Sequence, residues 1–173
     1  MKALILIDIQ NDYFPGGRFP LKGIRQAAQN AADLLADFRD KGYPVIHVMH
    51  LKPSQGPEKD AARGVFFVEN TKGAEIHQGV RPFANETVIQ KRYPNAFRGT
   101  DLDTILKVLG VRELHLAGAM TNMCVDSTAR AAFDLGYAVT VHERACAARA
   151  LLGTNLVHRI SIKTLASVFA SIA

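Results

Sequence analysis

The chain has 173 residues and a formal net charge of +5, from 21 Lys and Arg against 16 Asp and Glu. Its 48% hydrophobic and 21% charged residues are ordinary for a globular protein and exclude a disordered chain. Two cysteines are too few for a disulfide-rich scaffold, and no apolar run approaches the ~18 residues that cross a bilayer. The length predicts one domain, residues 1–173.

The positive charge raises the question of nucleic-acid binding. The basic residues are scattered, however, and Lys91-Arg92 is their only adjacent pair. We therefore expect a small-molecule substrate, with no nucleic-acid and no membrane partner. The apolar run at residues 3–7 is too short for a signal peptide and leads directly into Asp8, so we expect a reduced, cytoplasmic protein.

Short apolar runs alternate with amphipathic stretches along the chain, a pattern typical of a parallel α/β sheet. Strands are predicted at residues 3–7, 44–51, 86–90, 114–117 and 138–142, and helices at about 24–41, 102–109, 124–135 and 155–171. The long segment 52–85 is rich in glycine, proline and charge. Phe66 and Phe67 within it predict a packed lid or a pocket wall.

Three reactive side chains follow three of these strands. Asp8 follows the first strand, Lys91 the third, and Cys124 lies just beyond the fourth. Parallel sheets bind their ligands at the carboxyl ends of the strands, so an acid, a cation and a thiol should meet at one edge. The first strand lacks the glycine-rich turn of a dinucleotide site.

These residue types can perform nucleophilic catalysis together. Cys124 lies at a predicted strand-to-helix junction, where the helix dipole is expected to lower the pKa of its thiol. Asp8 should be partly desolvated and suited to accept a proton, and Lys91 can orient it. Taken singly, each has a simpler alternative: a buried apolar cysteine (as we expect for Cys146), a capping aspartate or a surface lysine.

Five ordered blocks extend the pattern: DIQNDYF (8–14), GAEI (73–76), KRYPNAFRGTDL (91–102), GAMTNMCV (118–125) and TARAAFDLGY (128–137). With them the chain resembles the isochorismatase-like cysteine hydrolase superfamily, which includes nicotinamidases and N-carbamoylsarcosine amidohydrolases. The resemblance implies a three-layer α/β/α, Rossmann-like fold around a mostly parallel six-stranded sheet. It also implies a homodimer or homotetramer.

The resemblance further implies an Asp-Lys-Cys triad, in which Asp8 accepts the proton of Cys124, Lys91 holds Asp8 ionised, and Cys124 forms a thioester. It places a cis peptide at Ala119–Met120 and an oxyanion hole at the backbone N–H groups of Met120 and Cys124. Isochorismatase proper cleaves a vinyl ether and lacks the cysteine. The sequence therefore favours a small amide or carbamoyl substrate.

Nicotinamidases carry an Asp-x-His metal motif after the second strand, whereas residues 47–54 here read HVMHLKPS. His47 and His50 lie three apart on a predicted strand, so their side chains should face opposite sides of the sheet. We expect no metal and no cofactor. A metal-assisted, nicotinamidase-like amidase and a non-catalytic binding protein that retains the fold are the alternatives.

Substrate contacts are expected from Gln10, Phe14, Phe66, Tyr93 and Thr121, with Phe67 and Phe97 as further aromatic candidates. For each aromatic residue, ordinary core packing is the alternative. The chain departs from the family at Arg144, where an acidic residue is common.

Overall fold

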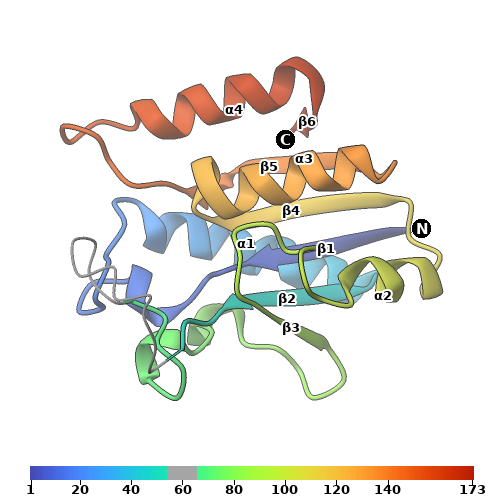
Figure 1. The fold of residues 1–173 in the computed structure, drawn as a ribbon, viewed down its shortest axis with the longest axis horizontal. Helices are drawn as coiled ribbons and strands as arrows, with labels where there is room; N and C mark the ends of the chain where they lie inside the picture. The colour runs from blue at the N-terminus through green and yellow to red at the C-terminus, as the bar shows by residue number, and fades with distance from the viewer. Residues whose placement is uncertain (54–65) are drawn as a thin grey trace.

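The computed structural model describes residues 1–53 and 66–173. Its centre is a six-stranded sheet of β1 (Lys2–Ile7), β2 (Val45–His50), β3 (Thr87–Lys91), β4 (Glu113–Ala119), β5 (Ala138–Ala147) and β6 (Ser171–Ile172). The order is β3-β2-β1-β4-β5-β6 and every pair is parallel (Figure 1). The chain runs outward from β1 to β3 and then returns to the other side of β1. The switch point between β1 and β4 is where such sheets bind ligands.

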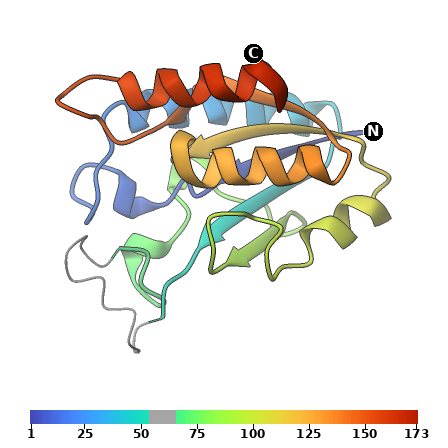
Figure 2. The same ribbon diagram turned by 45° about the horizontal axis from the view of Figure 1, so that its top comes forward.

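Helices cover both faces of the sheet and give three layers (Figure 2). The helices are α1 (Ile24–Asp40), α2 (Leu102–Val108), α3 (Asp126–Asp134) and α4 (Leu156–Val168). Side chains of α1 pack into one hydrophobic cluster, and side chains of α2, α3 and α4 pack into the other. The predicted three-layer α/β/α class is confirmed.

The position of β1 between two layers of helices explains why its sequence is apolar without interruption. Ala3, Ile5 and Ile7 face the cluster of α2, α3 and α4, whereas Leu4 and Leu6 face α1. All five are buried because helices cover both sides of the sheet. Asp8 is therefore the first polar residue at the carboxyl end of a strand that has no solvent-exposed face.

Two predicted boundaries near the fourth and fifth strands are wrong. The helix expected from residue 124 begins at Asp126, after a π-helical turn, η4 (Thr121–Val125). Strand β5 runs to Ala147 instead of residue 142, because an irregularity between Leu116 and Gly118 lets its pairing with β4 continue. The sheet is thereby extended beside the turn that carries Cys124.

The end of the chain also differs from the expected helix over 155–171. Helix α4 ends at Val168, and Ser171–Ile172 pair with β5 as the sixth strand. Two backbone bonds of Ala173 hold the sixth strand against β5. The Ala173 N–H donates to the Val141 carbonyl, and the Ala173 carbonyl accepts from the Glu143 N–H.

The long segment after β2 is described only from residue 66, so residues 54–65 of the predicted lid lie outside the described residues. Its later part contains two short 3-10 helices, η2 (Lys72–Ala74) and η3 (Gln78–Val80). A third, η1 (Asn11–Tyr13), follows β1 and packs against η2. Within the described part of the chain, every helix is too short or too polar to cross a membrane.

Candidate active site

Asp8, Lys91 and Cys124 meet at one edge of the sheet. The Lys91 Nζ atom lies 2.8 Å from Asp8 Oδ2. A carboxylate oxygen of Asp8, a ring nitrogen of His50 and the Cys124 sulfur lie within 4.8 Å of one another. The exposed fractions of Asp8, Lys91 and Cys124 are 0%, 1% and 4%. Strand ends thus bring the three expected residues into one buried cluster.

The backbone of Asp8 is held in a conformation that aspartate rarely adopts. Its φ is 52°, in the left-handed region, where a residue with a Cβ is strained. The Asp8 N–H donates to the Val48 carbonyl at 2.9 Å. Among the described residues, no donor bonds to Asp8 Oδ1. The carboxylate is therefore ion-paired with Lys91 and still has acceptor capacity for a proton.

The charges within the cluster fix its resting protonation. Burial alone would lower the pKa of the Lys91 ammonium, but the nearby Asp8 carboxylate outweighs it and raises that pKa. Burial and the Asp8 carboxylate raise the pKa of the Cys124 thiol well above its usual value. The expected lowering of this pKa by a helix dipole is therefore wrong. Cys124 rests as a neutral thiol and needs a base in order to attack.

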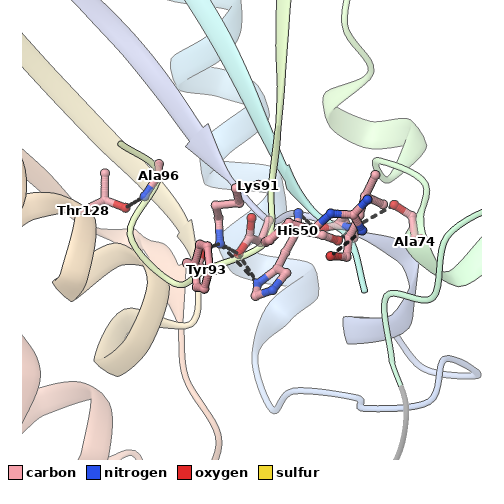
Figure 3. A network of polar contacts seen from close by, with 10 residues as sticks. His50, Ala74, Lys91, Tyr93, Ala96 and Thr128 are labelled. Atoms are coloured by element: carbon pink, nitrogen blue, oxygen red, sulfur yellow. Dashed lines mark hydrogen bonds and ion pairs between the residues drawn. The ribbon is translucent and has the colours of Figure 1, made fainter. Parts of the chain in front are cut away.

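His50 belongs to this cluster although the sequence reasoning set it aside. The register of β2 on β3 pairs His50 with Lys91, and the imidazole Nδ1 lies 3.3 Å from Lys91 Nζ (Figure 3). Burial and the Lys91 charge lower the pKa of His50 to about 4. The ring is therefore neutral near pH 7 and can accept a hydrogen bond from Lys91 through Nδ1. By contrast His47 bonds to Glu86 at 3.0 Å, so the two histidines have separate partners, as their spacing predicted.

Asp8, His50 and Cys124 together offer an oxygen, a nitrogen and a sulfur, a donor set that can bind zinc. The Lys91 ammonium, however, lies 2.8 Å from Asp8 Oδ2 and 3.3 Å from His50 Nδ1. A metal ion would have to share the position with this buried positive charge or displace it. The donor set is thus already occupied by a cation of the chain itself, and it fits a metal poorly.

Gln10 was expected to contact substrate, but its side-chain amide braces the site from within. Its Nε2 donates to the carbonyls of His50 at 2.9 Å and Ala74 at 2.7 Å, and its Oε1 accepts from the His50 N–H at 2.9 Å. Figure 3 labels His50 and Ala74, whose carbonyls accept these bonds. Gln10 therefore fixes the backbone of His50 beside Lys91.

Tyr13 is a second residue that the sequence reasoning missed. Its ring is 1% exposed and packs on Phe67 at 4.6 Å and Phe66 at 5.9 Å between ring centroids. Burial and then the charges of Cys124 and Asp8 raise the pKa of its phenol, so the ring adjoins the cluster. The position of Tyr13 within the block 8–14, which also holds Asp8, was the sequence signal that could have identified it. Phe14, chosen instead, stacks on His77 at 3.6 Å.

The other expected contact residues lie around the cluster in different ways. Phe66 stacks on Phe19, with Lys52 Nζ 4.0 Å from its ring centroid. The ring of Tyr93 is under the Arg98 guanidinium, while the Tyr93 carbonyl accepts from Lys91 at 3.1 Å (Figure 3).

Two more of the expected residues make contacts with residues outside the cluster. Thr121 is buried, and its hydroxyl lies 2.9 Å from His158 Nδ1. Phe97 stacks on Tyr137 at 6.1 Å and packs against the core.

The turn η4 holds Cys124 against the end of β1. The peptide bond Ala119–Met120 is cis. The Met120 carbonyl accepts hydrogen bonds from the N–H groups of Met123 at 3.0 Å and Val125 at 3.2 Å. Gly118, just before the turn, has φ 134°, and a Cβ there would lie 1.9 Å from the Ile7 carbonyl oxygen. Only glycine lets β4 approach β1 this closely.

Comparisons with known proteins relate the whole chain to one domain family. The model of the isochorismatase domain matches residues 2–173. The isochorismatase family protein YddQ of Bacillus subtilis is 50% identical over 149 residues, covering 86% of this chain and 79% of its own. Maleamate amidohydrolase of Pseudomonas putida is 33% identical over 149 residues, covering 80% and 68%. The structure of N-carbamoylsarcosine amidase from Thermoplasma acidophilum matches with a TM-score of 0.86 at 27% identity, covering 99% and 94%.

Proposed function

This chain belongs to the isochorismatase family, and from that premise we propose that it hydrolyses a C–N bond of a small amide or carbamoyl compound through a cysteine thioester. The observation that carries the proposal is the buried cluster of Asp8, Lys91 and Cys124. Relatives named maleamate amidohydrolase and N-carbamoylsarcosine amidase support the choice of bond.

In the first half of the reaction, the Asp8 carboxylate removes the proton of the Cys124 thiol as the sulfur attacks the carbonyl carbon. A general base is required because the raised pKa of Cys124 keeps the thiol neutral. A tetrahedral intermediate forms, with a new C–S bond and a negative oxygen. Asp8 then gives its proton to the leaving nitrogen, the C–N bond breaks, and a thioester and an amine result.

The negative charge that develops on the carbonyl oxygen has to be stabilised by hydrogen-bond donors directed at that oxygen. We assign this role to the backbone N–H groups of Met120 and Cys124, which belong to the short turn closed by the Met120 carbonyl. Lys91 contributes differently. Its ammonium pairs with the Asp8 carboxylate at 2.8 Å and stabilises the Cys124 sulfur while the sulfur carries negative charge.

In the second half, Asp8 accepts a proton from water as the water oxygen attacks the thioester carbon. The C–S bond breaks, the sulfur regains a proton from Asp8, and the carboxylic acid leaves. One carboxylate thus serves both halves. The aromatic wall of Tyr13, Phe66 and Phe67 beside the cluster favours a small substrate with an apolar part.

The test is to incubate the protein with a panel of small amides and carbamoyl compounds, measuring ammonia release and the mass of the intact chain. We expect turnover and an acyl adduct on Cys124. Cys124→Ala should lose both, whereas Cys146→Ala, which removes the chain's other buried thiol, should keep both. Full turnover by Cys124→Ala would refute the thioester. If no compound is turned over and Cys124 stays unreactive, the binding-protein alternative is the better one.

A further inference from the structure

A second cleft opens at the same end of the sheet, between the first turns of α1 and α4. Its volume is about 720 Å³, and its floor is the end of β5 with Cys146, Ala147 and Ala148. None of Asp8, Lys91 and Cys124 is among the described residues that line it. The cleft is thus separate from the reactive cluster, and the proposed function gives it no role.

The charged side chains around this cleft are mostly cationic. Lys22, Arg144 and Arg159 line it and are exposed. Among the described residues none of the three has an acidic partner, whereas Arg39 is paired with Glu86 and Arg130 with Asp126. Unpaired cations gathered around one concave surface create a positive potential that attracts anions.

The acid that lines the cleft does not cancel this charge. Glu143 is the single acidic side chain among the described lining residues, and its carboxylate lies 3.7 Å from His158 Nε2. Three cations therefore face one acid that already has a neighbour. Arg144 turns the balance of the cleft toward positive charge.

The backbone adds to the same field. Helices α1 and α4 both begin at the carboxyl end of the sheet (Figure 1), and their caps, Gly23 and Asn155, line the cleft. Neither cap makes a side-chain hydrogen bond to the first turn. The positive dipole ends of two helices are thus directed toward a cleft that already holds three cations.

We propose that this cleft binds a small anion bearing a phosphate or carboxylate group, with Arg144 and Arg159 as its principal charged contacts. Arg guanidinium groups suit both ligands because they bind planar or tetrahedral oxyanions in a bidentate manner. Lys22, whose Nζ already donates to the Gly153 carbonyl at 2.8 Å, supplies additional positive charge.

His158 gives the cleft a path to the reactive cluster. Its ring lines the cleft, and its Nδ1 lies 2.9 Å from the hydroxyl of Thr121, the first residue of the turn that carries Cys124. An anion beside His158 favours the protonated ring, which can then only donate to Thr121. Any effect of the anion on turnover rests on the proposed function, but binding itself does not.

Calorimetric titration of the full chain with inorganic phosphate, and separately with malonate, tests the proposal at constant ionic strength. We expect saturable binding of at least one anion, with the ring signals of His158 shifting in NMR spectra. Arg144→Gln/Arg159→Gln should weaken binding at least tenfold. The matched control Lys163→Gln, an exposed cation of α4 that does not line the cleft, should leave it unchanged.

Absence of saturable binding would overturn the proposal, as would equal binding by Arg144→Gln/Arg159→Gln. Cys124→Ala separates the two sites. If it abolishes phosphate binding while the double variant retains it, the anion sits at the reactive cluster and the cleft is not its site. Binding that survives in Cys124→Ala supports the cleft even if no amide is ever turned over.

Discussion

The Lys91 ammonium lies 2.8 Å from the Asp8 carboxylate, and both side chains are almost fully buried. Each charge is tolerated in the interior because the other is present. The pair therefore links stability to the proposed chemistry, since the same contact that holds the Asp8 carboxylate near Cys124 also compensates its burial. Variants of the two residues can separate these effects.

Lys91→Met leaves a buried carboxylate without its cation, and Asp8→Asn leaves a buried ammonium without its anion. We expect each to lower the free energy of unfolding by about 3–5 kcal/mol and to abolish turnover. The double variant, which removes both charges, should recover much of the stability and none of the activity. Denaturant unfolding and ammonia release measure the two quantities. Additive losses in the double variant would show that the charges are not coupled.

Gly118 offers a test of how the nucleophile turn is seated on β1. A Cβ at this position would lie 1.9 Å from the Ile7 carbonyl oxygen, and φ is 134°. Gly118→Ala should therefore cost at least about 3 kcal/mol of stability, from backbone strain and displacement of the strands. Gly99→Ala is the control, because Gly99 also has a positive φ, of 67°, but an added Cβ there would have no neighbouring atom of the described residues within 4 Å. This variant should lower the free energy of unfolding by about 1–2 kcal/mol. Equal losses in denaturant unfolding would contradict this reading.

The sequence was sufficient to predict the meeting of Asp8, Lys91 and Cys124. Their positions follow from strand ends, and parallel strands end at a common edge. His50 could not be found in this way, because its contact depends on the register that pairs it with Lys91 across β2 and β3. Local spacing carries no information about register between strands, so two histidines three residues apart looked like a structural pair.

The turn at Cys124 was missed for a related reason. A π-helical turn and the α-helix after it present similar apolar spacing, and what distinguishes them is the bond from Val125 N–H to the Met120 carbonyl. The extension of β5 to Ala147 likewise depends on a shift of register, in which extra residues of β5 between Val141 and Cys146 face Leu116 to Gly118 of β4. The expected dimer or tetramer depends on contacts between copies of the chain, so it stays a prediction. Sedimentation of the purified chain measures the oligomeric state.

His50 should make the protein sensitive to acid. Burial and Lys91 lower its pKa from 6.5 to about 4, so folding favours the neutral ring. The stability that this provides is complete above pH 6.5, and it is lost as the pH falls through 4. This contribution of His50 to the free energy of unfolding is on the order of 3 kcal/mol.

Unfolding free energies of the wild type and His50→Gln, measured from pH 7 to pH 4, test this. The loss on acidification should be smaller in the variant by about that amount. His142, whose pKa is also lowered to about 4, remains in both proteins and provides a common background. Parallel curves would mean that folding does not lower the pKa of His50.

Chelation separates the metal-free mechanism from the nicotinamidase-like alternative. Because Lys91 already places a cation among Asp8, His50 and Cys124, removal of metal should leave turnover within about twofold of the untreated enzyme. Elemental analysis of the purified protein should find far less than one equivalent of metal. Lys91→Met sharpens the test, because it removes the competing cation and leaves the donors Asp8, His50 and Cys124 in place. Zinc should bind this variant more tightly than the wild type, measured by competition with a chromogenic chelator.

Loss of wild-type turnover on chelation, restored by one equivalent of zinc, would instead support a metal-assisted amidase and remove Lys91 from its assigned role.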